Sequence, residues 1–325
     1  MAISPIEQSD AERISEEIHK LVDAVETVVI GKRPVVEMAM LALLCRGHLL
    51  IEDIPGVGKT TLAKALARVI GGEFRRIQFT PDLLPSDVTG STIYNQKTGE
   101  FQFHAGPVFA NVVLADEINR TTPKTQSALL EAMEERTVSV DGETHQLPAP
   151  FFVIATENNV ELLGTYPLPE AQMDRFFAKV ALGYPDSRAE AEILSSHQFE
   201  DPIDRLEPIT DPDSFHQLQE ETRRVWVEDS VRDYIVTIVA ATRSHPRVAL
   251  GSSPRGSLAL MAASQSWAVF HRRPYVVPDD VKRMAEPVMT HRIIGRPDSQ
   301  GRTPSAGQIV QEILDSTPTP VYSRS

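Results

Sequence analysis

Cysteine is almost absent from this sequence, because Cys45 is the only one among its 325 residues. An internal disulfide is therefore excluded. Long apolar runs are missing too: none approaches the roughly 20 residues that a membrane-spanning helix needs, and the longest, residues 38–45, predicts a core helix. Residues 1–13 lack the basic and apolar regions of a signal peptide. Together these absences predict a cytoplasmic protein without a membrane span.

Basic residues are outnumbered, with 32 Lys and Arg against 45 Asp and Glu and a net charge of −13. Proteins that bind nucleic acid usually present a basic face. The local basic clusters, residues 223–224 and 272–273, are short and are interpreted as solvated helix ends. Nucleic acid is therefore an unlikely partner by composition, although a basic pore inside a ring stays open.

Residues 48–64, HLLIEDIPGVGKTTLAK, form the strongest motif in the chain. A short apolar run leads into a glycine turn and then a helix-forming segment, which is the order of a P-loop. Gly56 and Gly58 let backbone N–H groups close around phosphate oxygens, and the following helix points its N-terminus at the same anion. Lys59 is expected to reach the β- and γ-phosphates, and the Thr60 hydroxyl to ligate Mg²⁺. The predicted nucleotide-binding residues of this loop are Pro55, Gly56, Val57, Gly58, Lys59, Thr60 and Thr61.

The P-loop departs from the strict GxxxxGK[ST] spacing at one position, where Asp53 stands in place of the first glycine. We interpret Asp53 as a turn residue that precedes the phosphate cradle, since Gly56 and Gly58 remain. The alternative is a glycine-rich turn between a strand and a helix that binds nothing. The GKT sequence in its proper context favours ATP or ADP as the ligand.

Buried-strand patterns alternate with helical ones through the first part of the chain. This alternation predicts an α/β fold: a P-loop core with a parallel, five-stranded sheet and right-handed connections. The expected strands are residues 48–51, 74–79, 111–115, 151–155 and 176–182. Residues 91–104 and 137–146 alternate in polarity around turn residues, which predicts two β-hairpin inserts.

Residues 183–186, Gly-Tyr-Pro-Asp, form the predicted domain boundary. No strand pattern follows it, whereas capping residues, prolines and apolar periodicity recur at helical spacing. We therefore predict a nucleotide-binding core over residues 1–184 and an all-helical lid over residues 185–325.

Two acids, Asp116 and Glu117, follow the apolar run at residues 112–115. A buried strand that ends in acids places them at the carboxyl edge of a parallel sheet, where ligands bind. Asp116 is expected to hold the Mg²⁺ hydration shell, and Glu117 to orient and polarise the attacking water as a general base. The alternative, two solvated carboxylates that start a turn, is disfavoured by the GKT sequence upstream.

Asn158 and Arg175 are further candidates near the γ-phosphate. Asn158 follows the fourth expected strand, and its amide is placed to hydrogen-bond the phosphate and the water, although asparagine in a loop is more often a turn residue. Arg175 has the charge that phosphoryl transfer needs, and arginine fingers contribute about 10³ to 10⁵ in rate. The alternative for Arg175 is a surface pair with Asp174 or Asp186. As a finger it would act from a neighbouring subunit, which implies a ring.

Arg255 lies in the first turn of a predicted helix, after an N-cap serine and a proline. A cation is unfavourable at this positive end of the helix dipole. We therefore expect Arg255 to reach from the lid to the nucleotide, with an ordinary exposed arginine as the alternative.

Five segments together resemble the MoxR branch of the AAA+ ATPases, from about residue 16 to about residue 320. They are IEDIPGVGKT, VVLADEINRTTPKTQSALLEAMEER, FFVIATENN, LPEAQMDRFF and GSSPRGSLAL. The resemblance implies these roles: Walker A for Lys59 and Thr60, Walker B for Asp116 and Glu117, sensor 1 for Asn158, the arginine finger for Arg175, sensor 2 for Arg255, and the adenine pocket for Val29, Ile30 and Gly31. The hairpins look like the helix-2 and pre-sensor-1 inserts of that clade. Asn159 departs from the family, which often has proline there.

Members of this branch are similar in forming hexameric rings that remodel protein complexes as chaperones do. They often act with partners that carry a von Willebrand factor A domain, in maturing or metal-loading those complexes. The resemblance thus implies an Mg²⁺-dependent ATPase that acts on a protein client. Two alternatives from other classes stay open: a DNA-translocating motor on the same core, and a nucleotide-gated scaffold with little turnover.

Overall fold

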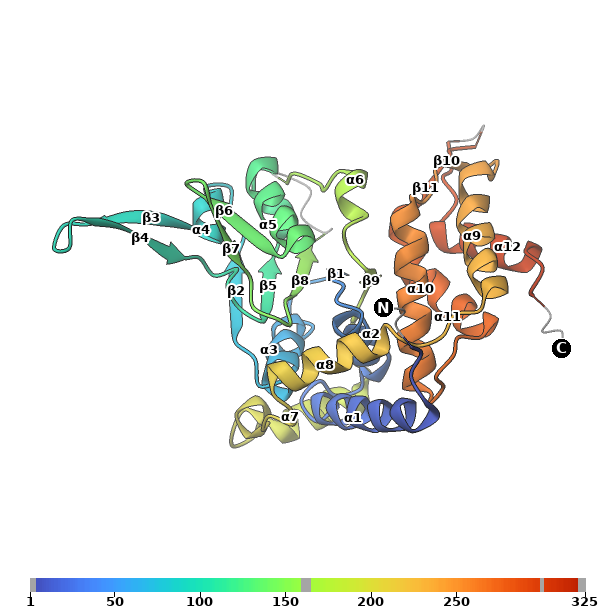
Figure 1. The fold of residues 1–325 in the computed structure, drawn as a ribbon, viewed down its shortest axis with the longest axis horizontal. Coiled ribbons are helices and arrows are strands. Elements are labelled where there is room, and N and C mark those ends of the chain that lie inside the picture. The colour runs from blue at the N-terminus through green and yellow to red at the C-terminus, as the bar shows by residue number, and fades with distance from the viewer. Residues whose placement is uncertain (1–3, 159–164, 299–300, 321–325) are drawn as a thin grey trace.

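A five-stranded parallel sheet lies at the centre of the computed structural model, which describes residues 4–158, 165–298 and 301–320 (Figure 1). Its strand order is β2-β5-β8-β1-β9. The strands are β1 (Leu49–Glu52), β2 (Phe74–Gln78), β5 (Val112–Asp116), β8 (Phe152–Glu157) and β9 (Ala178–Val180). All neighbours pair in parallel, so their carboxyl ends share one edge. The predicted α/β core is confirmed.

Both faces of the central strands β1, β5 and β8 are buried, which is why these strands read as continuous apolar runs, whereas the edge strand β2 carries exposed polar residues. Leu49 and Ile51 pack into one hydrophobic cluster, while Leu50 between them packs into the other. On the first face lie α1 (Gln8–Glu26), α2 (Arg33–Leu44) and α3 (Lys59–Val69), and on the second lies α5 (Pro123–Glu135). The sheet edge that carries the polar strand ends therefore stands on a rigid, fully packed support.

The C-terminal region is helical, as predicted, and falls into two groups. The first group, α7 (Ser187–Ser196), η2 (Pro202–Arg205) and α8 (Pro212–Thr222), lies on the core side (Figure 1). There the Ile209 N–H donates to the Val69 carbonyl at 2.9 Å, and Gln219 Nε2 donates to the Leu43 carbonyl at 2.6 Å. The second group forms the lid bundle: α9 (Asp229–Ser244), α10 (Pro254–Phe270), α11 (Pro278–Met289), η3 (Thr290–Arg292) and α12 (Ala306–Ser316).

One detail of the all-helical lid needs correction. Strands β10 (Val248–Leu250) and β11 (Ile294–Gly295) pair antiparallel within it. Each is only two or three residues long, too short for an alternating pattern to show in the sequence. Their pairing brings the segment before α10 next to the segment after η3.

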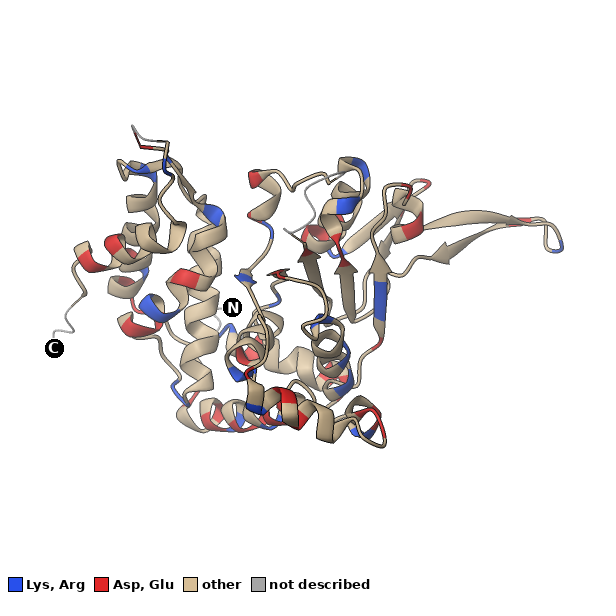
Figure 2. Cartoon of the chain, turned by 180° about the vertical axis from the view of Figure 1, so that it is seen from behind, with Lys and Arg blue, Asp and Glu red and all other residues tan. Residues whose placement is uncertain are grey.

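Charged residues of both signs are interspersed over the molecule. Figure 2 shows that segments with acidic and with basic residues are mixed along the helices in that view. None of the described helices is long and apolar enough to cross a membrane.

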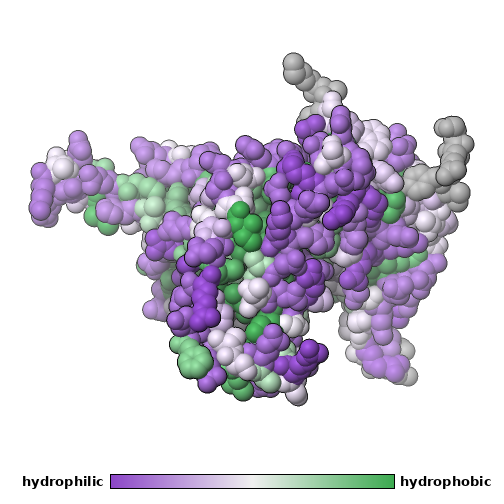
Figure 3. Space-filling model, turned by 90° about the horizontal axis from the view of Figure 1, so that it is seen from below, coloured by the Kyte–Doolittle hydropathy of each residue, from purple (hydrophilic) through white to green (hydrophobic). Residues whose placement is uncertain are grey.

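Two antiparallel hairpins extend from the core as predicted. The first, β3 (Gly90–Asn95) and β4 (Glu100–Ala105), follows α4 (Pro85–Thr89) and projects far from the body (Figure 1). Hydrophobic side chains gather along this projection (Figure 3), and Ile93, Tyr94 and Phe101 are at least half-exposed. The second, β6 (Thr137–Val140) and β7 (Glu143–Gln146), turns at residues 141–142. The rings of Phe103 and His145 stack at 3.9 Å and join the two inserts.

Candidate functional site

The loop between β1 and α3 is an open cradle. Gly56 and Gly58 have φ values of +83° and +93°, a left-handed conformation that favours glycine, and nothing lies within 4 Å of where a Cβ would stand. Helix α3 begins at Lys59, directly after Gly58. Backbone N–H groups and the positive end of a helix dipole therefore border open space, which is the arrangement that binds phosphate.

Lys59 lies among three carboxylates at the sheet edge. Its Nζ donates to the Asp53 carbonyl at 2.9 Å. Burial lowers the pKa of the Lys59 amine, while the negative charges of Asp116, Asp53 and Glu117 oppose that shift. The structure thus brings the predicted lysine and the predicted acid pair into one electrostatic neighbourhood, as expected for residues at the carboxyl edge of parallel strands.

Thr156 on β8 holds both acids in place. Its Oγ1 donates to Asp116 Oδ1 at 2.7 Å and accepts from the Glu117 N–H at 2.8 Å. Glu117 has a φ of +58°, and the short helix η1 (Ile118–Arg120) begins after it. A left-handed backbone conformation costs free energy in a residue other than glycine. It therefore persists only where surrounding contacts fix it. No pattern in the sequence indicated Thr156, which lies inside an apolar strand.

Strand β2 contributes two residues that the sequence did not indicate. Arg76 Nη2 lies 2.6 Å from Asp116 Oδ2, and Gln78 Nε2 donates to Glu117 Oε2 at 3.0 Å. Arg120 also pairs with Glu117, at 3.0 Å. Strand β2 is the outer strand, and Gln78 pairs in register with Asp116. This strand register is the only feature that could have pointed to Arg76 and Gln78, because exposed polar residues on an edge strand match no motif.

A cavity of about 220 Å³ extends from the cradle along the segment between α1 and α2. Of the predicted residues, Val29, Ile30, Gly56, Val57, Gly58 and Thr61 line it. Gly31 lies beside it, where a Cβ would stand 2.8 Å from the Ala189 Cβ. Sequence reasoning missed the other lining residues, Val28, Lys32, Pro185, Ile193 and His197. Ile193 lies on α7 and His197 directly follows that helix, so the helix after the predicted boundary closes this space from the far side.

Asn158 follows Glu157, the last residue of β8, and is 6% exposed. Its carbonyl accepts from Asn119 Nδ2 at 3.4 Å. This position lies at the same sheet edge as Asp116, since β5 and β8 are neighbours. Asn159, where the sequence departs from the family pattern, lies outside the described residues.

Arg175 and Arg255 lie together, away from the cradle. Both pair with Glu134 near the end of α5, Arg175 through Nε at 3.1 Å and Arg255 through Nη2. Arg255 lines a separate cavity of about 450 Å³ and is not among the residues that line the P-loop cavity. The surface pair considered for Arg175 thus involves Glu134 and neither of the two aspartates named from the sequence. Arg255 does not extend toward the cradle of its own chain.

Asp53 has a definite role in the fold, beyond that of a turn residue. Its Oδ2 accepts from the backbone N–H groups of Leu182 and Gly183 at 2.5 and 2.6 Å, and its Oδ1 accepts from the Ile54 N–H at 2.8 Å. A carboxylate can accept several such bonds, whereas a glycine could accept none. Asp53 therefore ties the cradle to the chain that leaves β9 and leads to α7.

Replacing Asp53 by Ala should lower the free energy of unfolding by about 2 to 4 kcal/mol, because two partly buried N–H groups lose a charged acceptor. The measurement is the midpoint of urea denaturation. Asp233→Ala is the matched control, since Asp233 is an exposed aspartate on α9. Equal midpoints for the two variants would contradict the role of Asp53.

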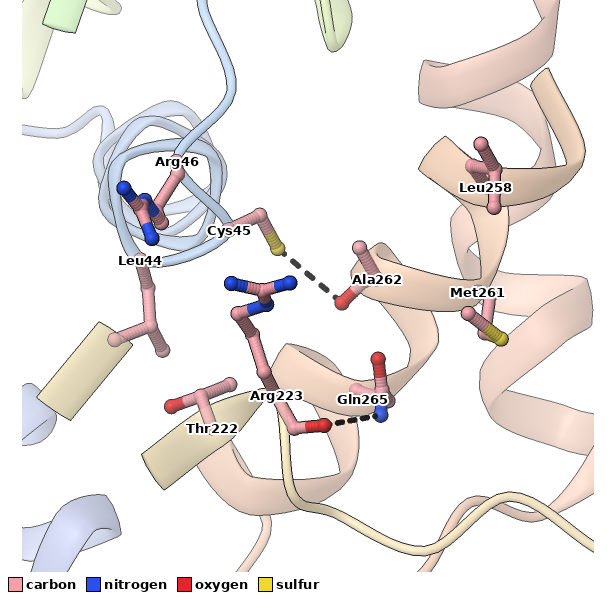
Figure 4. A pocket seen from close by; sticks show the side chains of 9 residues that line it. All are labelled: Leu44, Cys45, Arg46, Thr222, Arg223, Leu258, Met261, Ala262 and Gln265. Carbon is pink, nitrogen blue, oxygen red and sulfur yellow. Dashed lines mark hydrogen bonds between the residues drawn. The ribbon is translucent and has the colours of Figure 1, made fainter. Parts of the chain in front are cut away.

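A further cavity, of about 410 Å³, lies between α2, α8 and α10 (Figure 4). The Cys45 thiol donates to the Ala262 carbonyl at 3.2 Å, and Gln265 Nε2 donates to the Arg223 carbonyl at 3.1 Å. Burial raises the pKa of the Cys45 thiol to about 12. A protonated thiol is a poor nucleophile. Cys45 is therefore not a candidate nucleophile in this cavity.

Two family descriptions match this chain. Residues 48–178 match the "ATPase family associated with various cellular activities (AAA)", and residues 240–313 match the "AAA lid domain". The first range covers the sheet from β1 to β9, and the second covers most of the lid bundle.

Several relatives are similar over nearly the whole chain. The uncharacterized protein YeaC of Bacillus subtilis is 53% identical, over 93% of this chain and 94% of its own length. Chaperone MoxR1 of Mycobacterium tuberculosis is 41% identical, over 95% of this chain and 85% of its own. A crystal structure of a candidate ATPase from Cytophaga hutchinsonii is 36% identical, with a TM-score of 0.90 over 96% of this chain and 98% of that one.

Proposed function

This chain belongs to the MoxR branch of the AAA+ ATPases, and on that premise we propose that it couples Mg²⁺-dependent ATP hydrolysis to the remodelling or maturation of protein complexes. One observation carries the proposal. The open cradle, Lys59 and the carboxylates of Asp116 and Glu117 converge at one edge of the sheet. That convergence is what phosphoryl transfer needs, because its catalysis is mostly positioning and charge stabilisation.

The residues of the cradle fit a triphosphate. The space beyond Gly56 and Gly58 admits phosphate oxygens next to backbone N–H groups, and Lys59 adds a cation. The apolar cavity lined by Val29 and Ile30 fits the base. ATP and ADP are therefore the proposed ligands, with the phosphates in the cradle and the adenine toward α1 and α7.

Thr60 and Asp116 would hold Mg²⁺. When bound, the ion supplies charge neutralisation on the β- and γ-phosphate oxygens. The hydroxyl of Thr60 stands in the first turn of α3, and Thr156 fixes the carboxylate of Asp116 through one oxygen. Arg76, which pairs with the other oxygen, is half-exposed, so its side chain has room to turn toward solvent.

Glu117 is the proposed general base, which orients the attacking water and takes its proton. Its backbone N–H donates to Thr156, which fixes the position of the residue. Its side chain contacts Gln78 and Arg120. Asn158 at the end of the neighbouring strand is proposed to hydrogen-bond the γ-phosphate and the same water.

Arg175 and Arg255 are proposed to serve the nucleotide of a neighbouring subunit together. They share the carboxylate of Glu134, lie on the core and the lid respectively, and both remain partly exposed. Neither lines the P-loop cavity of its own chain. Two cations grouped at one surface fit an interface that stabilises charge developing on a phosphate across it. This supports a closed ring, for which we propose six identical subunits.

The projecting hairpin is the proposed contact for a protein client. Exposed apolar side chains in a group mark interaction surfaces. Tyr94 and Phe101, whose ring centroids lie 5.2 Å apart, form such a group on one face of the hairpin, and the exposed Ile93 lies on the other face. The stack of Phe103 on His145 links this hairpin to the second one. Resemblance to the family, and nothing further, supports a partner with a von Willebrand factor A domain and a role in metal loading. A cytoplasmic location stays a prediction made from the sequence.

Removing Mg²⁺ tests the proposed reaction directly. With EDTA in excess, phosphate release from ATP should fall by about 100-fold or more, because the developing charge loses its main counter-ion. Adding Mg²⁺ back should restore the rate. Hydrolysis that persists in EDTA would contradict the proposed roles of Thr60 and Asp116.

The two alternatives make different predictions for the same assay. A DNA-translocating motor should hydrolyse faster when DNA is added and should bind it in a salt-dependent way; the net charge of −13 and the mixed charges of Figure 2 disfavour it. A scaffold with little turnover should release almost no phosphate in Mg²⁺. The presence of both Asp116 and Glu117 at the sheet edge favours the hydrolase.

A further inference from the structure

The lid holds the backbone on both sides of Arg175. Arg292, the last residue of η3, contacts the short segment 174–177 through four hydrogen bonds. Its Nε lies 2.8 Å from Asp174 Oδ1, and its Nη2 donates to the Asp174 and Phe176 carbonyls at 3.3 and 2.5 Å. Its Nη1 donates to the Phe177 carbonyl at 3.1 Å. A guanidinium carries five donors in a rigid plane, so four fixed acceptors define its position closely.

A second lid residue, Ser253, binds the same aspartate. Ser253 Oγ donates to Asp174 Oδ2 at 2.6 Å and accepts from the Arg255 N–H at 3.0 Å, as the N-cap of α10. The nearby His291 Nε2 lies 3.0 Å from the Phe176 carbonyl. Both oxygens of Asp174 are thus bound by the lid, and the residue that binds one of them also caps the helix that carries Arg255.

These contacts are buried, so they constrain the segment firmly. The side chain of Arg292 is 3% exposed and that of Asp174 is 15% exposed. Burial lowers the pKa of Arg292 to about 10, against the raising effect of Asp174, which leaves the guanidinium charged near neutral pH. Breaking a buried ion pair by removing one partner is strongly unfavourable, because the other charge stays desolvated.

The core and the lid hold this segment from opposite sides. The helix before Arg175, α6 (Glu170–Met173), is a single turn, and one turn of helix is not stable by itself. On the core side, the Phe177 N–H donates to the His48 carbonyl at 2.7 Å, and Glu134 holds the side chain of Arg175. The lid binds the carboxylate just before Arg175 and the carbonyls after it, so Arg175 lies between a core contact and a lid contact.

We propose that Arg292 is a positioning residue for hydrolysis: it fixes segment 174–177 to the lid, so that a movement of the lid displaces Arg175. The inference rests on the proposed role of Arg175 as the arginine finger. It adds the physical link by which the lid of one subunit controls the nucleotide site of the next. Arg292 itself touches no nucleotide and acts only through the backbone of residues 174–177.

The test is Arg292→Lys, measured in the assembled full-length protein alone and combined with Arg175→Ala. Lysine keeps the charge but lacks the planar fork, so it cannot hold Asp174 and two carbonyls together. We expect kcat to fall about 10- to 100-fold, as for a displacement of about 1 Å at a reacting group, with KM for ATP changed less than about twofold. In the Arg175→Ala background, Arg292→Lys should cause no further loss.

Ser253→Ala is the second, milder variant, in case Arg292→Lys does not fold. It removes one contact to Asp174 and should lower kcat several-fold. Ser305→Ala is its matched control, because Ser305 caps α12 in the same lid by accepting from the Gln308 N–H at 3.2 Å. The control should leave kcat unchanged.

The outcomes separate this inference from the proposed function. If Arg175→Ala lowers kcat but Arg292→Lys and Ser253→Ala do not, the positioning role is wrong and the finger stands. Equal losses from Arg292→Lys with and without Arg175 would also overturn it, because they indicate a general structural defect. If Arg175→Ala has no effect, the finger itself is wrong and the inference is overturned with it.

Discussion

Replacing Glu117 by Gln reduces phosphate release about a thousandfold and leaves ATP binding intact: this is the result we expect from the acid pair at the sheet edge. The amide has nearly the size and shape of the carboxylate but cannot take a proton from water, and a positioned base contributes about 10² to 10⁴ in rate. Single-turnover phosphate release measures the first quantity, and equilibrium binding of ATP measures the second.

The structure makes this substitution a clean one. The Glu117 backbone is fixed by Thr156, and that contact involves only the N–H of residue 117, so it survives the change of side chain. Glu135→Gln, an exposed glutamate at the end of α5, is the matched control and should hydrolyse ATP normally. Unchanged turnover in Glu117→Gln would remove Glu117 from its proposed role, whereas loss of ATP binding would indicate that the cradle had been disturbed.

The features that the sequence predicted correctly depend on local chemistry. A strand buried on both faces must be apolar throughout, and a tight phosphate loop needs glycine where φ is positive, so residues 48–64 and 112–117 could be interpreted without a structure. The hairpins were predictable for the same reason, because alternating polarity and the Asp141–Gly142 turn act over a few residues.

What the sequence could not predict depends on contacts between distant segments. Gln78 reaches Glu117 only because β2 pairs with β5 in one register, and His197 reaches the cavity only because α7 lies against the segment that follows α1. The departure at Asp53 became intelligible once Leu182 and Gly183 were found on its carboxylate. Such residues belong to no sequence motif, because their contacts form only when distant segments pack together.

Arg255 illustrates the same limit most clearly. Its place in a helix first turn could be predicted, but its direction depends on how the lid sits on the core. Packing of α10 on α1 and α2 holds that arrangement, together with the bonds of Asp174 to Arg292 and Ser253, and all of these contacts join residues far apart in sequence. This placement of the lid turns the Arg255 side chain toward Glu134 and Arg175, and so toward the proposed neighbouring subunit.

Mixing two inactive variants should therefore restore activity that neither has alone. Arg175→Ala chains keep Glu117, and Glu117→Gln chains keep Arg175, so a mixed ring contains some interfaces with both groups intact. With equal amounts and random assembly, about a quarter of the sites should be complete, and phosphate release should recover to about that fraction. The measurement is phosphate release after the two proteins are mixed and reassembled. No recovery would show that Arg175 acts on its own chain.

A second mixture decides how Arg255 acts. If Arg175 and Arg255 both serve the neighbour's nucleotide, one donor chain must carry both arginines. A mixture of Arg175→Ala with Arg255→Ala contains no such chain and should stay inactive at every ratio. If instead Arg255 served the nucleotide of its own chain, the same mixture would recover about a quarter of the activity, because some sites would pair an intact Arg255 with a neighbour's intact Arg175. The shared carboxylate of Glu134 favours the first outcome, since it holds both guanidinium groups at one surface.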